Sequence, residues 1–152
     1  MQKKEVNGEA IARNLLEMSR LKVPVICVVI GEGSSGGALA LGVGDKILML
    51  ENAIYSILSP EGFASILYKD STKNKQAAEE MKITAKDLKE LDLIEEIIEE
   101  PEGGAQKKPN EVYKNLKKSI IKNLKELEKI DRNKLTEERY NKFRTMGQKF
   151  VK

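Results

Sequence analysis

The sequence predicts an α/β fold whose C-terminal end is entirely helical. A β-branched apolar run over residues 23–30 precedes a glycine-rich segment, short strand and helix patterns then alternate as far as residue 98, and a helical repeat begins at Pro109. At 152 residues the chain is long enough for one domain with a core and too short for two of average size. We therefore expect an α/β core over residues 1–106 and a helical extension over residues 107–152.

The first expected elements are an amphipathic helix and a buried strand. Apolar side chains recur at steps of three and four over residues 8–21, which predicts a helix with Asn7 as its N-cap. Pro24 then ends the helical pattern. Residues 25–30 form a continuous apolar run, which is typical of a strand buried on both faces.

Short strands and helices are expected to follow the glycine-rich segment. Pro60 suits the first position of a helix, because it lacks only a donor that the helix leaves unpaired. Thr84, with Asp87 three positions later, resembles a helix-capping arrangement. The other elements expected here are helices at residues 38–42 and 73–82, and strands at residues 45–50, 53–58 and 93–98, the last ended by the break at residues 101–104.

The end of the chain is predicted to form two helices. Apolar residues recur every three to four positions after Pro109, with lysines on the opposite face: Val112, Leu116, Ile120, Leu124 and Leu127. A last helix over residues 136–146 is expected to place Leu135, Tyr140 and Phe143 on one side.

The charge of the chain is unevenly distributed. The net charge of +3 divides into +9 for residues 107–152 and −6 for residues 1–106. A basic end suits an anionic partner such as nucleic acid, a membrane surface or a phosphorylated cofactor, but its interspersed acidic residues favour a solvated helical face. The aromatic content of 5% argues against base stacking on nucleic acid. No apolar run approaches the roughly 20 residues of a membrane span, so we expect a cytoplasmic protein.

The absence of histidine and the single cysteine exclude several chemistries. Without imidazole there is no Ser-His-Asp triad, and the commonest metal ligand is missing. Cys27 stands alone, which excludes an intrachain disulfide and a cysteine-based zinc cluster, so we expect no metal site. On its apolar run, Cys27 is expected to be a buried small hydrophobe, and Ser35 a loop-stabilising hydroxyl rather than a nucleophile.

The glycine-rich segment over residues 31–37 is the strongest candidate site. Glycines between a strand and a helix allow a sharp turn and remove side chains that keep ligands away from main-chain N–H donors, which predicts an anion or oxyanion cradle. A Walker A loop is excluded, because Gly37 stands where lysine is required. Residues 31–36 formally match a dinucleotide fingerprint, but Glu51 only loosely fits the required acidic position.

Four longer runs resemble a known family. Residues 23–45, 55–62, 83–91 and 97–105 closely resemble the α subunit of bacterial acetyl-CoA carboxylase carboxyltransferase, and they correspond to its C-terminal half. The resemblance implies a crotonase-like (ClpP/crotonase) spiral of repeated ββα units, incomplete at the N-terminus. Ser34 occupies a position where that family usually has glycine.

The resemblance also implies a function and a set of partners. Members of the family transfer the carboxyl group of carboxybiotin, held on a separate biotin carboxyl carrier protein, to acetyl-CoA, and so form malonyl-CoA for fatty acid biosynthesis. They act with a β subunit that bears a zinc ribbon. Gly36 and Gly37 match the family's backbone donors to the biotin oxygen, and Gly33, Ser34 and Ser35 match the adjoining substrate-binding loop. No metal is implied for this chain.

Two other functions remain open at this point. The chain is also consistent with a subunit of another crotonase-like acyl-CoA enzyme, such as a decarboxylase, and with a non-catalytic assembly fragment. Because the resemblance covers only one half of the subunit, we expect open sheet edges, no activity from the chain alone, and either self-association or binding to a complementary half.

Overall fold

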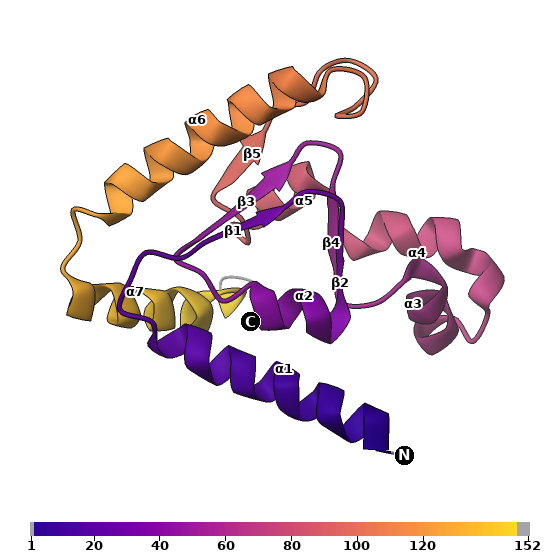
Figure 1. The fold of residues 1–152 in the computed structure, drawn as a ribbon. Coiled ribbons are helices and arrows are strands. Elements are labelled where there is room, and N and C mark those ends of the chain that lie inside the picture. The colour runs from indigo at the N-terminus through magenta and orange to yellow at the C-terminus, as the bar shows by residue number, and fades with distance from the viewer. Residues whose placement is uncertain (1, 149–152) are drawn as a thin grey trace.

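The fold is built around a small parallel sheet, shown in Figure 1. The computed structural model describes residues 2–148, with side chains from Gly8 onward. Three strands run in the order β1 (Ile26–Val29), β3 (Lys46–Leu50) and β5 (Glu96–Ile98). A second parallel pair joins β2 (Glu32–Ser34) to β4 (Ile54–Ser56). The α/β class expected from the sequence is confirmed.

The buried strand is β3, and not the first apolar run. Both neighbours of β3 pair with it in parallel, so Leu48 and Met49 have no exposed surface. The sequence predicted that residues 25–30 would be buried on both faces, and this was wrong: β1 lies at the edge of the sheet, all its residues are half-buried, and Ile30 is 68% exposed. A run of apolar residues shows only that a segment is hydrophobic, whereas the order of the strands in the sheet decides which segment is buried.

The helices on either side of β1 begin earlier than predicted. Helix α1 covers Gln2–Arg20, so Asn7 lies within it and is not its N-cap. Helix α2 covers Ser35–Leu41, whereas the sequence placed its start at residues 37–38. Short helices α3 (Pro60–Leu67), α4 (Asn74–Met81) and α5 (Ala85–Glu90) follow the expected pattern, with a 3-10 turn at Ser71–Lys73.

Two predicted helix starts are confirmed in atomic detail. Ser59 caps α3, its hydroxyl accepting the N–H of Gly62 at 3.2 Å, and Pro60 is the first helical residue. Thr84 caps α5 by accepting the N–H of Asp87, and its own hydroxyl donates to the Asp87 carboxylate at 2.6 Å. Such caps satisfy donors that a helix leaves unpaired at its N-terminus, which makes these starts visible in local sequence.

The C-terminal part consists of α6 (Pro109–Leu127) and α7 (Arg132–Thr145). Helix α7 begins four residues earlier than predicted, because Asp131 caps it through the N–H of Asn133. Leu135 is buried but Tyr140 is 60% exposed, so the two do not share one side of the helix as the sequence predicted. Arg139 is buried instead. Among the described residues, no helix is long and apolar enough to cross a membrane.

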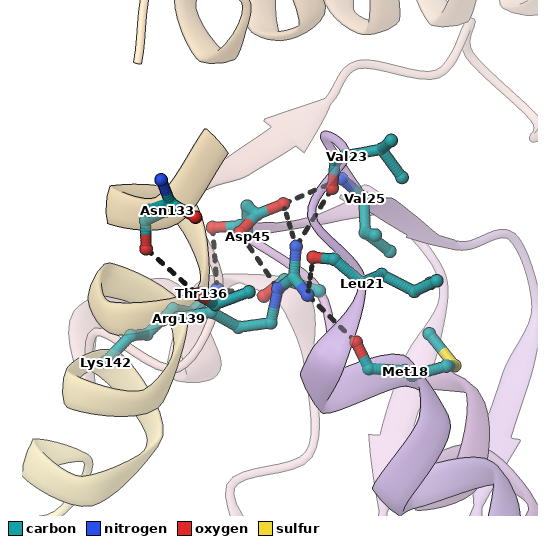
Figure 2. A network of polar contacts seen from close by, with 10 residues as sticks. Met18, Leu21, Val23, Val25, Asp45, Asn133, Thr136, Arg139 and Lys142 are labelled. Carbon is teal, nitrogen blue, oxygen red and sulfur yellow. Dashed lines mark hydrogen bonds and ion pairs between the residues drawn. The ribbon is translucent and has the colours of Figure 1, made fainter. Parts of the chain in front are cut away.

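Arg139 joins α7 to the rest of the fold through a fully paired guanidinium, drawn in Figure 2. It forms a two-pronged ion pair with Asp45, with Nε–Oδ1 and Nη2–Oδ2 distances of 2.9 and 2.8 Å. Its remaining donors reach carbonyl oxygens at the end of α1 and in the segment that follows: those of Met18, Leu21 and Val23. Asp45 also accepts the N–H of Val25 at 2.7 Å. One side chain therefore fixes α7, α1 and the entrances to β1 and β3.

Two further polar anchors hold the C-terminal helices. Lys142, one turn after Arg139, binds the Glu95 carboxylate at 2.7 Å, and burial lowers the pKa of its ammonium group. Glu96 on β5 receives hydrogen bonds from α6, donated by Ser119, Lys122 and Asn123. Desolvation acts to raise the pKa of Glu96, but these hydrogen bonds outweigh it and the pKa is lowered.

Replacing Arg139 by methionine is expected to destabilise the chain strongly. The substitution leaves Asp45 buried without its counter-charge, which costs about 3–5 kcal/mol of unfolding free energy. Denaturant titration measures the loss. Arg144→Met is the matched control, because Arg144 lies on the same helix but is exposed, and its effect should stay within about 0.5 kcal/mol. Equal losses for the two variants would contradict the anchoring role of Arg139.

Glu96 should make the chain sensitive to acid. Its pKa is lower in the folded state than the ordinary 4.5, so below that pH the unfolded chain binds more protons and the unfolding free energy falls as pH falls. Replacing Glu96 by glutamine should flatten this dependence in denaturant titrations at pH values below 4.5. Glu99→Gln is the matched control, because Glu99 is exposed just after β5, so this variant should change the unfolding free energy little.

Candidate functional site

The candidate site lies where β2 passes directly into α2. Gly33 and Ser34 belong to β2, whose Glu32–Ser34 register pairs with Ile54–Ser56 of β4. Ser34 is the N-cap residue of α2, and Ser35, Gly36 and Gly37 form its first turn. The structure therefore gathers all five predicted site residues into one strand-to-helix turn, with the two predicted donors at the start of the helix.

The sharp turn is made by a serine and not by a glycine. Ser35 has φ of 58°, a left-handed conformation that costs an ordinary residue energy, whereas Gly36 and Gly37 are not among the positive-φ glycines. The sequence attributed the turn to glycine flexibility, and that interpretation was wrong. At this turn, the contribution of Gly36 and Gly37 is the space left by their missing side chains.

The N–H groups of this first turn are available to a ligand. An α-helix gives no internal partner to its first N–H groups, and the Ser34 side chain makes no capping hydrogen bond. The Ser34 hydroxyl instead accepts a hydrogen bond from Ser56 at 3.3 Å. A Cβ on Gly37 would meet no atom within 4 Å, and Gly37 is exposed. The donors of Gly36 and Gly37 therefore lie at an accessible, positively polarised helix end.

An apolar cavity of about 640 Å³ adjoins these donors. Ser35 and Gly36 line it, together with Tyr55 and Ser56 of β4 and Ile57 just after that strand. Phe143 and Met146, at the end of the C-terminal part, also line it. Its ionisable lining residues are Tyr55 and Lys82, and Lys82 lies 3.9 Å from the Asp87 carboxylate. The site thus offers backbone donors and apolar walls rather than a carboxylate base.

A second cavity has a volume of about 420 Å³. It runs along β1 and is lined by Gly33 and Cys27. The Cys27 thiol donates to the carbonyl of Leu41 at 3.0 Å, and burial raises its pKa, so Cys27 is protonated at neutral pH and not a reactive thiolate. Tyr55 and Ile47 line both cavities.

Glu61 does not belong to this site. Glu61 is exposed in the first turn of α3, where Asn74 donates a hydrogen bond to it at 3.0 Å and lowers its pKa, so it is ionised and is not a cavity-lining residue. Among the described residues, no group of three or more histidine, cysteine, aspartate and glutamate side chains is arranged to hold a metal ion.

Sequence reasoning overlooked Tyr55 and the end of α7 as parts of the site. Tyr55 stands opposite Gly33 in the β2–β4 register, and the pairing of two three-residue strands leaves little periodic signal. Phe143 and Met146 reach the cavity only because Arg139 and Lys142 dock α7. This docking depends on the burial of Arg139, and the sequence does not show which of the many basic residues of α7 is buried.

Comparison with known proteins identifies the family. Residues 2–147 match the family described as acetyl co-enzyme A carboxylase carboxyltransferase-like. A relative from Clostridium botulinum (strain Alaska E43 / Type E3), named acetyl-coenzyme A carboxylase carboxyl transferase subunit alpha, is 60% identical over 92% of this chain and 51% of its own length. A relative of the same name from Xanthomonas axonopodis pv. citri is 57% identical over 92% of this chain and 44% of its own. The chain thus spans about half the length of these relatives.

Solved structures establish the fold. A Pseudomonas malonate decarboxylase hetero-tetramer in complex with coenzyme A aligns with a TM-score of 0.70 at 15% identity, covering 91% of this chain and 55% of the other. The transcarboxylase 12S hexamer aligns with a TM-score of 0.62 at 17% identity, covering 78% of this chain and 22% of that one. These likenesses confirm the crotonase-like fold that the sequence resemblance implied.

The family match extends from α1 to the end of α7. It therefore includes the strand-to-helix turn. It also includes the C-terminal helices, which lie outside the four runs quoted from the sequence. On this evidence the chain belongs to the acetyl co-enzyme A carboxylase carboxyltransferase-like family.

Proposed function

We propose that this chain supplies the α side of an acetyl-CoA carboxylase carboxyltransferase, which transfers a carboxyl group from carboxybiotin to acetyl-CoA and forms malonyl-CoA for fatty acid biosynthesis. The observation that carries the proposal is the pair of open first-turn donors at Gly36 and Gly37, in a chain 60% identical to relatives named for that activity. Because the chain spans half of those relatives, the activity is proposed for a complete assembly and not for this chain alone.

The proposed role of this chain is to stabilise negative charge. When bound, carboxybiotin supplies the carboxyl group, and negative charge develops on its ureido oxygen as the carboxyl departs. The N–H groups of Gly36 and Gly37 would donate hydrogen bonds to that oxygen, and the positive end of α2 would reinforce them. Donors fixed in place before reaction each lower such a barrier by about 3 kcal/mol.

The cavity next to the donors fits the ring system of such a group. Its walls are mainly apolar, and its lining includes Ser35 and Ser56 as well as Gly36. Gly33, Ser34 and Ser35 are proposed to shape this loop, because β2 pairing fixes the first two and the left-handed conformation of Ser35 redirects the chain into α2. An apolar site with a few placed polar groups is the usual form of a small-ligand pocket.

The remaining components would come from other chains. We propose a β subunit bearing a zinc ribbon, a biotin carboxyl carrier protein and acetyl-CoA as partners, in the cytoplasm. The exposed apolar residues around β1 support an assembly, since Ile30 and Leu41 are each 68% exposed and Val23 is 48% exposed. The free edge of β1 in the described sheet supports it as well.

Replacing Gly37 by alanine tests whether an oxygen must come close to these donors, since alanine keeps the N–H group and adds a methyl group. The added Cβ meets nothing within the chain, so the unfolding free energy should stay constant or rise by about 0.5–1 kcal/mol, as for other helical glycines. The same Cβ would stand in the path of the oxygen and should lower malonyl-CoA formation about 100-fold in the complex reconstituted with its partner subunits.

Gly8→Ala is the matched control for this experiment. Gly8 also lies in a helix, and a Cβ added there would meet no atom within 4 Å, so this variant should match the stability of Gly37→Ala and retain full carboxyl transfer. Unchanged activity in Gly37→Ala, alongside an active control, would remove the basis for the proposed role.

The two alternatives predict different results with the same complex. A decarboxylase subunit would release carbon dioxide from malonyl-CoA without using biotin, whereas a carboxyltransferase would accept a free biotin analogue as carboxyl acceptor. A non-catalytic assembly fragment would show neither reaction and no binding of a coenzyme A thioester. The malonate decarboxylase likeness supports only the fold at 15% identity, so it does not favour the first alternative.

A further inference from the structure

Tyr55 packs against the segment that carries Gly36 and Gly37. It is the middle residue of β4, it stands opposite Gly33 of β2, and its N–H donates to the carbonyl of Ile83 at 3.1 Å. Its side chain is half-buried and lines both cavities. The ring is therefore held in place by β4, and it contacts neighbouring segments.

Two glycines leave room for this ring, one at each end of the turn and helix. A Cβ on Gly33 would lie 2.9 Å from Cδ2 of Tyr55, and a Cβ on Gly42, the C-cap of α2, would lie 2.5 Å from its Oη. Both distances are shorter than real Cβ contacts. The ring meets Gly33 through its carbon edge and Gly42 through its hydroxyl, so one rigid side chain contacts both ends of the segment that holds the donors.

We propose that Tyr55 is the positioning residue for the Gly36 and Gly37 donors, setting the place of α2 relative to β2 through its packing against Gly33 and Gly42. The aromatic ring is rigid and the protein interior is densely packed, so neither glycine can move closer to Tyr55 without displacing the ring. The ring therefore fixes the distance between Gly33 and Gly42. Movement of the ring would shift β2, the turn and α2 together. This inference rests on the proposed function for its effect on catalysis, but not for its effect on the position of the two N–H groups.

The two contacts are separable by substitution. Tyr55→Phe removes only Oη, so it should relieve the clash of Gly42→Ala and leave that of Gly33→Ala unchanged. Tyr55→Leu removes the ring and should relieve both. In the natural background each glycine variant should lower the melting temperature by on the order of 5 °C. Part of the Gly42→Ala loss should persist, because its Cβ also lies 3.0 Å from the Ala38 carbonyl oxygen.

Gly31→Ala is the control for these double-mutant cycles. Its Cβ would meet nothing within 4 Å, so its effect should be the same in all three backgrounds. The arrangement described for the ring would be overturned if Tyr55→Phe changed the effect of Gly33→Ala. It would also be overturned if Tyr55→Phe left the effect of Gly42→Ala unchanged.

Glycine-selective ¹⁵N labelling of the full chain reports on the donors themselves, since the chain has only 11 glycines. The Gly37 amide signal is assigned by its loss in Gly37→Ala, and that of Gly36 by its loss in Gly36→Ala. Tyr55→Leu should shift both signals, and Tyr55→Phe should shift them less. Tyr113→Leu is the matched control, because Tyr113 lies exposed on α6 and lines neither cavity. Unmoved Gly36 and Gly37 signals in both Tyr55 variants would overturn the proposal, whatever the activity.

Carboxyl transfer in the reconstituted complex tests the catalytic consequence. Tyr55→Leu should lower kcat on the order of 10-fold to 100-fold while KM for acetyl-CoA stays constant, as expected for displaced donors. A KM increase at constant kcat would contradict a positioning role in the reaction. Shifted amide signals together with full activity of Gly37→Ala would instead retain Tyr55 as a positioning residue and remove the proposed function of the donors.

Discussion

The buried pair of Arg139 and Asp45 is the constraint on which the rest of this structure depends. Only 1% of the arginine side chain and 5% of the aspartate side chain are exposed, and the two residues are 94 positions apart in the chain. Buried charges are tolerated only when they are paired and hydrogen-bonded, and here the guanidinium also satisfies three main-chain carbonyl groups. Several elements therefore set the position of Arg139, and its side chain holds those elements together.

That constraint reaches the candidate site along two routes. Asp45 also binds the N–H of Val25, which precedes β1, and β1 is followed by β2 and the strand-to-helix turn. Arg139 and Lys142 dock α7, whose neighbouring residues Phe143 and Met146 line the cavity beside Gly36. The helical C-terminal part thus contributes to the site, although it looks like an appendage in the sequence. Its many other basic residues are largely exposed, as expected for a solvated helical face.

The fold and the chemistry rest on different kinds of evidence. Parallel strand order and layer arrangement are shared with proteins of 15% and 17% identity, so these features are compatible with several reactions. The local features behind the proposed function are narrower: the N–H donors on the first turn of α2, the lack of a side chain at Gly37, and a mainly apolar cavity. Relatives near 60% identity are named for the carboxyl transfer that we propose.

The sequence by itself determined the local elements and pointed to the candidate site. Caps at Ser59 and Thr84, the helical repeat after Pro109 and the strand-to-helix turn are all encoded by neighbouring residues, because capping and periodicity act over one or two turns. Only the tertiary structure decided that β1 is an edge strand, that Ser35 takes the left-handed turn, that Arg139 is buried and that Tyr55 lies between Gly33 and Gly42. Each of these depends on segments far apart in the chain meeting in space, and no local pattern records which partner will be there.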